Sequence, residues 1–174
     1  MNIVLIGLRG SGKTAVGRIL AQKMGRELIE MDELIALKAG LTIPEIVAKH
    51  GWEKFREIEE DVTSQVAKLD NIINASGGGV VTSGKNIARL KKKGVLVWLQ
   101  ASVDTLVNRT GEDSRRPPLV KGRSRREDME IALKERKPLY QQAADLAINT
   151  ENKTPEEVAD LVIELLKIRG FAGD

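Results

Sequence analysis

Cysteine is absent from this chain, and histidine occurs only once. Without cysteine the protein has neither a disulfide framework nor thiol chemistry, which is compatible with a reducing cytosol. No apolar run approaches the ~20 residues that a membrane-spanning helix needs, and the chain starts with a strand-like apolar run instead of a basic leader. We therefore expect a cytoplasmic protein that does not associate with a membrane.

A strong excess of charge is also missing, since the formal net charge is only +3. A charge of this size suits an anionic ligand but does not indicate nucleic acid. The basic cluster between residues 115 and 126 is flanked by acidic residues, and no nucleic-acid recognition motif is present. We expect small anionic substrates, no nucleic-acid partner, and a monomer.

What the sequence does contain is an alternation of strand and helix patterns, in a chain of ordinary composition with 41% hydrophobic and 30% charged residues. This alternation is typical of a parallel sheet with helices on both faces. We predict one α/β domain over residues 1–174, a three-layer sandwich around a five-stranded parallel sheet. The predicted strands are Asn2–Ile6, Glu27–Met31, Asn71–Ala75, Val95–Leu99 and Leu146–Asn149. The predicted helices are Lys13–Met24, Asp32–Ala39, a start at Thr42, Trp52–Leu69, Gly84–Lys93, Val103–Thr110, Glu127–Ala143 and Thr154–Arg169.

The segment GLRGSGKT, from Gly7 to Thr14, fits the phosphate-loop pattern G-x-x-x-x-G-K-[ST] in full. Its glycines let successive N–H groups turn inward around a polyphosphate, and the next helix points its positive end at the same place. Lys13 can reach the outer phosphates, and the Thr14 hydroxyl is a hard oxygen suited to Mg²⁺. The pattern predicts a site for a nucleoside triphosphate with Mg²⁺, formed by Gly10, Ser11, Gly12, Lys13, Thr14 and Ala15.

Two carboxylates, Glu30 and Asp32, stand at the end of the second predicted strand. Residues two apart share one face of a strand, and ligands of parallel sheets bind at the carboxyl ends of strands. We therefore expect the pair beside the phosphate loop, with Glu30 steering the waters of Mg²⁺ and Asp32 accepting a proton from an attacking hydroxyl. Alternatively, Asp32 only caps the following helix.

Glycines and arginines mark a candidate surface for a second substrate. Gly77–Gly79 end the third predicted strand and would let a ligand approach their N–H groups. Arg56 lies three residues before Glu59 in a predicted helix, so that the carboxylate can hold the guanidinium in place. Arg136 precedes Pro138, which we expect to kink or end its helix.

Residues 111–126 are polar, hold two prolines and two glycines, and show no periodicity. This profile is typical of a mobile loop. In a nucleotide-binding protein we expect such a loop to be a lid that closes over the phosphates and excludes water, with Arg116 as its charged contact.

Taken together, these segments resemble shikimate kinase. GLRGSGKT, the acid pair, KFREIEE, SGGG, SRRPPL and ERKPLY follow one another in this order, and the resemblance spans essentially the whole chain. It implies a P-loop fold like that of the nucleoside monophosphate kinases. It also implies transfer of the γ-phosphate of ATP to the 3-hydroxyl of shikimate, in the pathway to chorismate and the aromatic amino acids.

The resemblance further implies roles for single residues and segments. Asp32 would bind the hydroxyls of shikimate and act as the base. The residues implied to hold the acceptor are Asp32, Arg56, Gly78, Gly79 and Arg136, with the acceptor-binding helices at about 32–61. Arg116 would contact the phosphates, Arg109 would lie against the adenine, and Lys153 stands where the family often carries an adenine-side arginine.

The chain departs from the family pattern at two motifs. Glu30-Met31-Asp32 stands where Asp-x-Asp is usual, so that the first acid is one methylene longer. Arg116-Pro117-Pro118-Leu119 stands where Arg-Pro-Leu-Leu is usual, and the second proline should stiffen the lid.

Three alternatives stay open on the sequence alone. A nucleoside monophosphate kinase would share the fold and the lid, but only 3% of the residues are aromatic and available for stacking a second base. A gluconate-type kinase would not need two arginines for a carboxylate. A non-catalytic nucleotide switch would want Asn-Lys-x-Asp, which Asn152-Lys153-Thr154-Pro155 does not complete.

Overall fold

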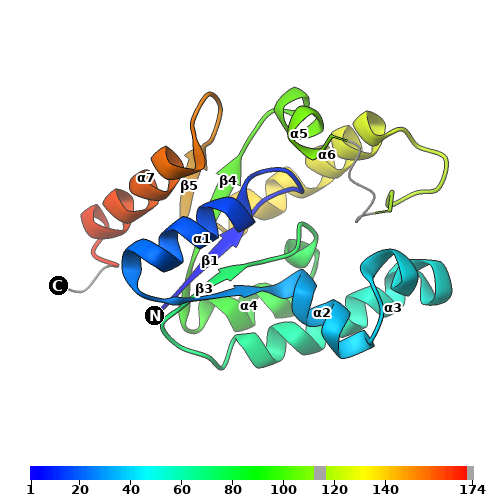
Figure 1. The fold of residues 1–174 in the computed structure, drawn as a ribbon, viewed down its shortest axis with the longest axis horizontal. Coiled ribbons are helices and arrows are strands. Elements are labelled where there is room, and N and C mark those ends of the chain that lie inside the picture. The colour runs from blue at the N-terminus through cyan, green and yellow to red at the C-terminus, as the bar shows by residue number, and fades with distance from the viewer. Residues whose placement is uncertain (112–116, 172–174) are drawn as a thin grey trace.

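The computed structural model describes residues 1–111 and 117–171. Its centre is a five-stranded sheet with the strand order β2-β3-β1-β4-β5, in which every neighbouring pair is parallel (Figure 1). The strands are β1 (Asn2–Ile6), β2 (Glu27–Glu30), β3 (Ile72–Ala75), β4 (Gly94–Gln100) and β5 (Leu146–Asn149). The predicted five-stranded parallel sheet is confirmed.

Helices cover both faces of the sheet, as the alternation of buried side chains along β1 requires. Ile3 and Leu5 pack with α1 (Lys13–Met24) and α7 (Pro155–Ile168). Val4 and Ile6 point to the opposite face. There they pack with residues of α4 (Gly84–Lys91), α5 (Val103–Thr110) and α6 (Arg125–Ala143). These contacts make the three-layer sandwich, and β1 lies at its centre.

A third apolar cluster forms beside the β2–β3 edge of the sheet, from α2 (Met31–Ala39) and α3 (Ile43–Val66). The separate starts predicted at Thr42 and Trp52 belong to one helical segment with a kink at Gly51, where φ is 79° and ψ is 171°. Thr42 and Glu45 form a capping box at its start. The helices predicted from local patterns therefore exist, but packing joins two of them.

Two expectations near the site are corrected. The strand β2 ends at Glu30, one residue before its predicted end, and α2 begins at Met31, which is fully buried. Asp32 is helical, as predicted, so the acid pair does not share one face of a strand. Pro138 does not end α6, which continues to its predicted end at Ala143. Ala132 on one side of Pro138 and Tyr140 on the other are buried in the core, and this burial outweighs the one helical hydrogen bond that proline removes.

Two features near the site were not predicted from the sequence. A single 3₁₀ turn, η1 (Val80–Thr82), follows the glycine run. The helix α6 begins at Arg125, two residues earlier than predicted, since Ser124 and Glu127 form a capping box there. None of the helices in the described part of the chain is long and apolar enough to cross a bilayer.

Candidate active site

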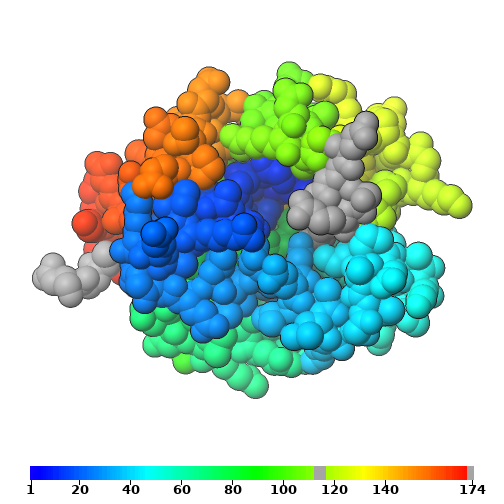
Figure 2. Space-filling model, viewed as in Figure 1, coloured from blue at the N-terminus to red at the C-terminus, as the bar shows by residue number. Residues whose placement is uncertain are grey.

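A cavity of about 1090 Å³ opens at the carboxyl ends of the strands. Leu8, Glu30, Ser76 and Thr150 line it, and each lies at or just after the end of a different strand. In Figure 2 it corresponds to the hollow in the middle of the visible face, between the phosphate loop and α3. Its place agrees with the rule that ligands of parallel α/β sheets bind at this edge.

The phosphate loop has the tight backbone that its glycines predict. Gly7, Gly10 and Gly12 have φ values of 145°, 85° and 97°. A Cβ on Gly7 would lie 2.7 Å from the Leu99 carbonyl oxygen, and one on Gly10 would lie 2.9 Å from Cγ2 of Thr110. Glycine is therefore required at both positions for conformation and for space.

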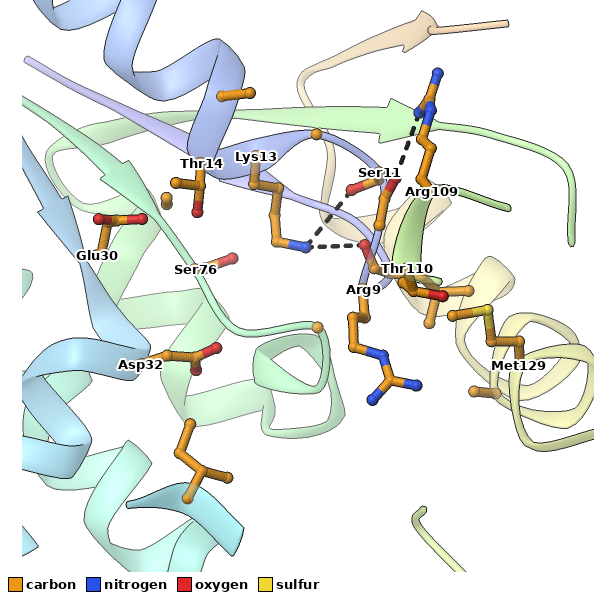
Figure 3. Close-up of a pocket in the computed structure, with 18 of the residues that line it drawn as sticks. Arg9, Ser11, Lys13, Thr14, Glu30, Asp32, Ser76, Arg109, Thr110 and Met129 are labelled. Carbon is orange, nitrogen blue, oxygen red and sulfur yellow. Dashed lines mark hydrogen bonds between the residues drawn. The ribbon is translucent and has the colours of Figure 1, made fainter. Parts of the chain in front are cut away.

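Lys13 is the first residue of α1 and extends back along the loop that precedes it (Figure 3). Its ammonium donates to the carbonyl oxygens of Gly7 at 2.7 Å and Leu8 at 2.9 Å. These bonds hold the positive charge within the loop and at the cavity wall. The loop and the first turn of α1, up to Ala15, line the cavity, so the predicted phosphate-binding residues are brought together.

The side chains suited to a metal lie next to this loop. Thr14 and Glu30 point toward the same part of the cavity (Figure 3). Glu30 also lies close to Glu33, and a hydrogen bond with Glu30, together with its negative charge, raises the pKa of Glu33. Arg18 lies 3.5 Å from Glu30 and partly balances its charge. A cation would relieve this repulsion, so the residues present fit a divalent metal.

The metal would need ligands from water and from a nucleotide in addition to the protein side chains. Within residues 1–111 and 117–171, no three acidic, histidine or cysteine side chains are grouped closely enough to form a metal cage. Mg²⁺ prefers oxygen ligands and usually keeps several waters while it binds one or two protein groups and the phosphates of a nucleotide. The pair Thr14 and Glu30 matches this pattern.

Asp32 lies in the first turn of α2 and faces the cavity (Figure 3). The N-cap position of α2 is occupied by Glu30, two residues earlier, so the alternative in which Asp32 only caps this helix is wrong. Although β2 ends at Glu30, the turn into α2 brings the carboxylate of Asp32 to the cavity wall, which Ser76 also lines.

The two arginines predicted for the acceptor, Arg56 and Arg136, both line the cavity. Arg56 donates to Glu59 at 2.8 Å, which confirms the predicted pair, and Glu59 is almost fully buried. The guanidinium also lies over the rings of Trp52 and Phe55, with 5.5 Å and 5.2 Å to their centroids. Arg56 is thus held by a charge and by aromatic faces.

Arg136 reaches the same region from α6. Burial lowers the pKa of Arg136, and the positive charge of Arg56 acts in the same direction, whereas Tyr140 and Glu59 oppose the shift. Two guanidinium groups therefore lie within electrostatic range of one another, and the carboxylate of Glu59 acts on both. Such an arrangement favours an anion in the cavity.

The glycine run Gly77–Gly79 lies against these two arginines. A Cβ on Gly78 would lie 3.7 Å from Nη1 of Arg136. A Cβ on Gly79 would overlap the guanidinium of Arg56, with only 2.5 Å to its Cζ. The contact at Gly78 would be an ordinary one, whereas the absence of a side chain at Gly79 gives Arg56 its space, a role that the sequence pattern did not reveal.

Arg109 and Lys153 line the other end of the cavity. Arg109 donates to the Thr150 hydroxyl at 3.0 Å and to the Thr150 carbonyl at 3.1 Å, and it reaches the Gly10 carbonyl at 3.4 Å. Lys153 lies in the turn between β5 and α7, with its ammonium 3.5 Å from the Glu151 carbonyl. The structure brings both residues to the phosphate-loop side.

Part of the predicted lid is described, and Arg116 lies outside the described residues. Pro117 and Leu119 line the cavity. The indole N–H of Trp52 donates to the Pro118 carbonyl at 3.3 Å, and the Leu119 amide donates to Asp128 at 3.0 Å. This part of the segment therefore contacts both the kinked helix α3 and the start of α6.

Sequence reasoning missed two residues of the site. Arg9, a variable position of the phosphate-loop pattern, lines the cavity, and its side chain points into it (Figure 3). Tyr140 is fully buried behind the glycine run and donates to the Gly78 carbonyl. The loop pattern carries no signal for the first residue, and a buried tyrosine in a helix carries none for the second.

These groups define a class of protein: a phosphate-loop kinase that takes a nucleotide on one side of its cavity and a small anion on the other. Comparison with known proteins gives the family. The model of the shikimate kinase family matches residues 9–167. The shikimate kinase of Symbiobacterium thermophilum is 40% identical over 174 residues, covering 99% of this chain and 100% of its own length.

Two further relatives agree with this result. The shikimate kinase of Thermodesulfovibrio yellowstonii is 41% identical over 163 residues, covering 94% of this chain and 93% of its own. A solved structure, shikimate kinase from Acinetobacter baumannii in complex with shikimate, superimposes with a TM-score of 0.93 at 35% identity, covering 97% of this chain and 93% of that one. This chain belongs to the shikimate kinase family, as the resemblance predicted.

Proposed function

We propose that the protein transfers the γ-phosphate of ATP to the 3-hydroxyl of shikimate and forms shikimate 3-phosphate, in the pathway to chorismate and the aromatic amino acids. Its family and its full-length relatives support an ATP-dependent kinase of shikimate. The structural observation that carries the proposal is the convergence of Arg56 and Arg136 on a cavity that also holds the phosphate loop.

The arginine pair explains why the acceptor would be a carboxylic acid. Arg56 forms an ion pair with the buried carboxylate of Glu59, and Arg136 adds a second positive charge nearby, which an anionic ligand would balance. A planar guanidinium matches a carboxylate with two parallel, charge-assisted hydrogen bonds. The amides of Gly78 and Gly79 would add donors at the same wall. A nucleoside monophosphate or a neutral sugar as the acceptor would explain the arginine pair less well than a carboxylic acid does.

Asp32 and Lys13 would act on the reacting hydroxyl and on the phosphates. Asp32 would bind the acceptor hydroxyls and accept the proton of the attacking hydroxyl. Lys13 would neutralise charge on the transferred group, where developing charge is stabilised most effectively by a group that is already in position. The two residues come from different helices, α2 and α1, on opposite sides of the region where the hydroxyl would lie.

Mg²⁺ would be held by Thr14 and by Glu30, either directly or through water. When bound, Mg²⁺ supplies positive charge to the phosphate oxygens and keeps the transferred group in line. Mg²⁺ would also offset the negative charge of Glu30, which, after a hydrogen bond between the two side chains, is the second cause of the raised pKa of Glu33.

The remaining nucleotide contacts would come from the phosphate loop and from two cations. Gly10, Ser11, Gly12, Lys13, Thr14 and Ala15 would cradle the phosphates, as their loop geometry and lining positions support. Arg109 and Lys153 would flank the adenine. Residues 111–126 would form a lid over the phosphates with Arg116 as its charged contact, and helices within residues 32–61 would form the acceptor side. We also propose a cytoplasmic monomer.

The direct test is a phosphotransfer assay with ATP and a panel of acceptors: shikimate, its methyl ester, gluconate and nucleoside monophosphates. We expect efficient turnover of shikimate alone, because the ester removes the negative charge that the arginines would hold. If a nucleoside monophosphate or gluconate is phosphorylated at a rate comparable to that of shikimate, the protein is another kinase of this fold.

The arginine pair can be tested with a charge-preserving variant. Arg136→Lys keeps the charge but loses the planar fork, so we expect a weaker affinity for shikimate by about one to two decades at an unchanged affinity for ATP, since charge-assisted hydrogen bonds contribute about 1.5–3 kcal/mol. Arg89→Lys is the matched control, because Arg89 binds Glu60 between α4 and α3. If Arg136→Lys and Arg89→Lys change the affinity for shikimate equally, Arg136 has no specific role in the acceptor site.

A further inference from the structure

We infer that Tyr140 is a positioning residue for the acceptor, acting through the Gly78–Gly79 peptide and through Arg136. The inference rests on the proposed function of this cavity. Tyr140 is the only tyrosine of the chain and is fully buried in α6. Its hydroxyl donates to the carbonyl of Gly78, which is 62 positions away in the sequence.

This hydrogen bond sets the direction of one peptide group. A trans peptide is planar, and its C=O and N–H point in opposite directions. When Tyr140 holds the Gly78 carbonyl toward α6, the N–H of Gly79 in the same peptide points away from α6. Gly78 lines the cavity, so an amide held in this direction would be available to the acceptor carboxylate.

The neighbouring carbonyls of the glycine run are held as well, but locally. The Gly77 carbonyl accepts from the Val80 amide at 3.2 Å. The Gly79 carbonyl accepts from the Thr82 hydroxyl at 2.6 Å and from the Thr82 amide at 3.0 Å. The Gly78 carbonyl is therefore the one held from another layer of the fold. Glycine has no side chain to restrict rotation, so this contact decides the orientation of the peptide.

Arg136 lies one helical turn earlier on the same face of α6. Tyr140 opposes the effect of burial on the pKa of the Arg136 guanidinium. A hydroxyl has one proton to donate and lone pairs to accept. Because its proton is directed to the Gly78 carbonyl, its lone pairs are left to stabilise the positive charge of Arg136, and Tyr140 acts on two of the groups proposed to grip the acceptor.

Packing alone does not account for this hydroxyl. The ring of Tyr140 stacks on Trp98, with 5.5 Å between centroids and 22° between planes. Phenylalanine would fill that space equally well, and a buried hydroxyl is unfavourable unless it forms hydrogen bonds. The hydroxyl is therefore accounted for by its hydrogen bond to the Gly78 carbonyl and by its effect on Arg136.

The test is Tyr140→Phe, which keeps the ring and its stacking but removes the hydroxyl. We expect a folded protein whose KM for shikimate rises by about 5- to 30-fold, since a lost buried hydrogen bond typically costs about 1–2 kcal/mol. The KM for ATP should change by less than twofold. The preference for shikimate over its methyl ester should fall by a similar factor, because Tyr140 acts through the groups that bind the carboxylate.

The matched control is Trp98→Phe, which weakens the stacking but leaves the hydroxyl in place. We expect it to lower the melting temperature without a selective change in the KM for shikimate. If Tyr140→Phe folds and leaves that KM unchanged, or raises both KM values equally, the hydroxyl is a packing group and the inference is wrong. If the wild-type protein does not phosphorylate shikimate at all, the proposed function itself fails.

A second measurement does not depend on the folding of a variant. Because the chain has a single tyrosine, fluorotyrosine incorporated in its place reports only on position 140. We expect its fluorine NMR signal to shift when shikimate binds and to respond less to the methyl ester. An unchanged signal at saturating shikimate would overturn the inference.

Discussion

Lys13 and Asp32 reach the cavity from the first turns of two different helices, α1 and α2. Lys13 is held against the carbonyl oxygens of its own loop, so its charge is already in place before any phosphate is near. Asp32 depends on the sharp change from β2 to α2 at Met31 for its position. At the scale of the residue, catalysis would rest on groups whose backbone positions are set by the ends of secondary-structure elements.

The first prediction concerns Asp32. We expect Asp32→Asn to keep ATP binding but to lower the turnover number by about a hundred- to ten-thousandfold, because the amide is nearly isosteric yet cannot accept a proton. Steady-state kinetics with shikimate would measure this loss. Asp61→Asn provides the control, since that exposed carboxylate of α3 pairs with Lys38. Activity above half that of the wild type would exclude Asp32 as the base.

The second prediction concerns Gly79. An alanine here would place its Cβ against the guanidinium of Arg56, so we expect Arg56 to be displaced and the KM for shikimate to rise by about tenfold or more, in line with the loss of a charge-assisted hydrogen bond. Gly84→Ala is the matched control, because no atom lies within 4 Å of a Cβ at that helical position. It should leave the kinetics unchanged and stabilise the fold by about 0.5–1 kcal/mol.

At the scale of the element, α3 connects the acceptor side with the described part of the lid segment. The kink at Gly51 is followed directly by Trp52, whose indole donates to the Pro118 carbonyl. The same ring lies beside Arg56. A ligand that moves Arg56 would therefore act on a side chain that already contacts the segment 117–124.

The third prediction tests the proposed lid by limited proteolysis with trypsin. Lys121 is exposed in the described part of the segment, so we expect cleavage after it in the free protein. With shikimate and a non-hydrolysable ATP analogue bound together, the lid would close and cleavage should slow by about tenfold or more, if closure protects the backbone from local opening. The control is the rate of cutting after Lys92, at the far end of α4. Equal rates at Lys121 with and without both ligands would argue against a lid.

At the scale of the whole molecule, three apolar clusters surround the sheet, and the cavity lies at the edge where they meet. Tyr140 belongs to the cluster under α4, α5 and α6, yet its hydroxyl is part of the wall behind the acceptor. The stability of the fold and the shape of the site are thus linked through one buried side chain.

The fourth prediction follows from that burial, which raises the pKa of Tyr140 to about 12 from an unfolded value of 10.0. Below pH 10 the phenol is protonated in both states, so stability is unaffected there. Between about pH 10 and 12 only the unfolded chain releases the proton, and the free energy of unfolding should fall by about 2–3 kcal/mol as the pH rises.

Two measurements check this prediction. The absorbance of tyrosinate reports on Tyr140 alone, since the chain has no other tyrosine. We expect a midpoint near pH 12 in the folded protein and near pH 10 in denaturant. The pH dependence of unfolding should also be shallower in Tyr140→Phe over the same range. A native midpoint close to 10 would show that the phenol is reached by water.

Local sequence patterns were enough for the phosphate loop, the five strands and most helices. The loop has required glycines and a fixed lysine, and strands and helices repeat their apolar residues with different periods. The pair of Arg56 and Glu59 was also predictable, because residues three apart on a helix are neighbours. Each of these features depends on residues close together in the chain.

Contacts between distant segments were decided only by the tertiary structure. The sequence did not predict that Gly79 makes room for Arg56 or that Tyr140 holds the Gly78 carbonyl. In each case the outcome depends on how whole layers pack, where many small burial energies together outweigh a single local preference. The motif therefore determined which phosphate chemistry this chain performs, while the packing of α3 and α6 against the glycine run determined how an acceptor can be held.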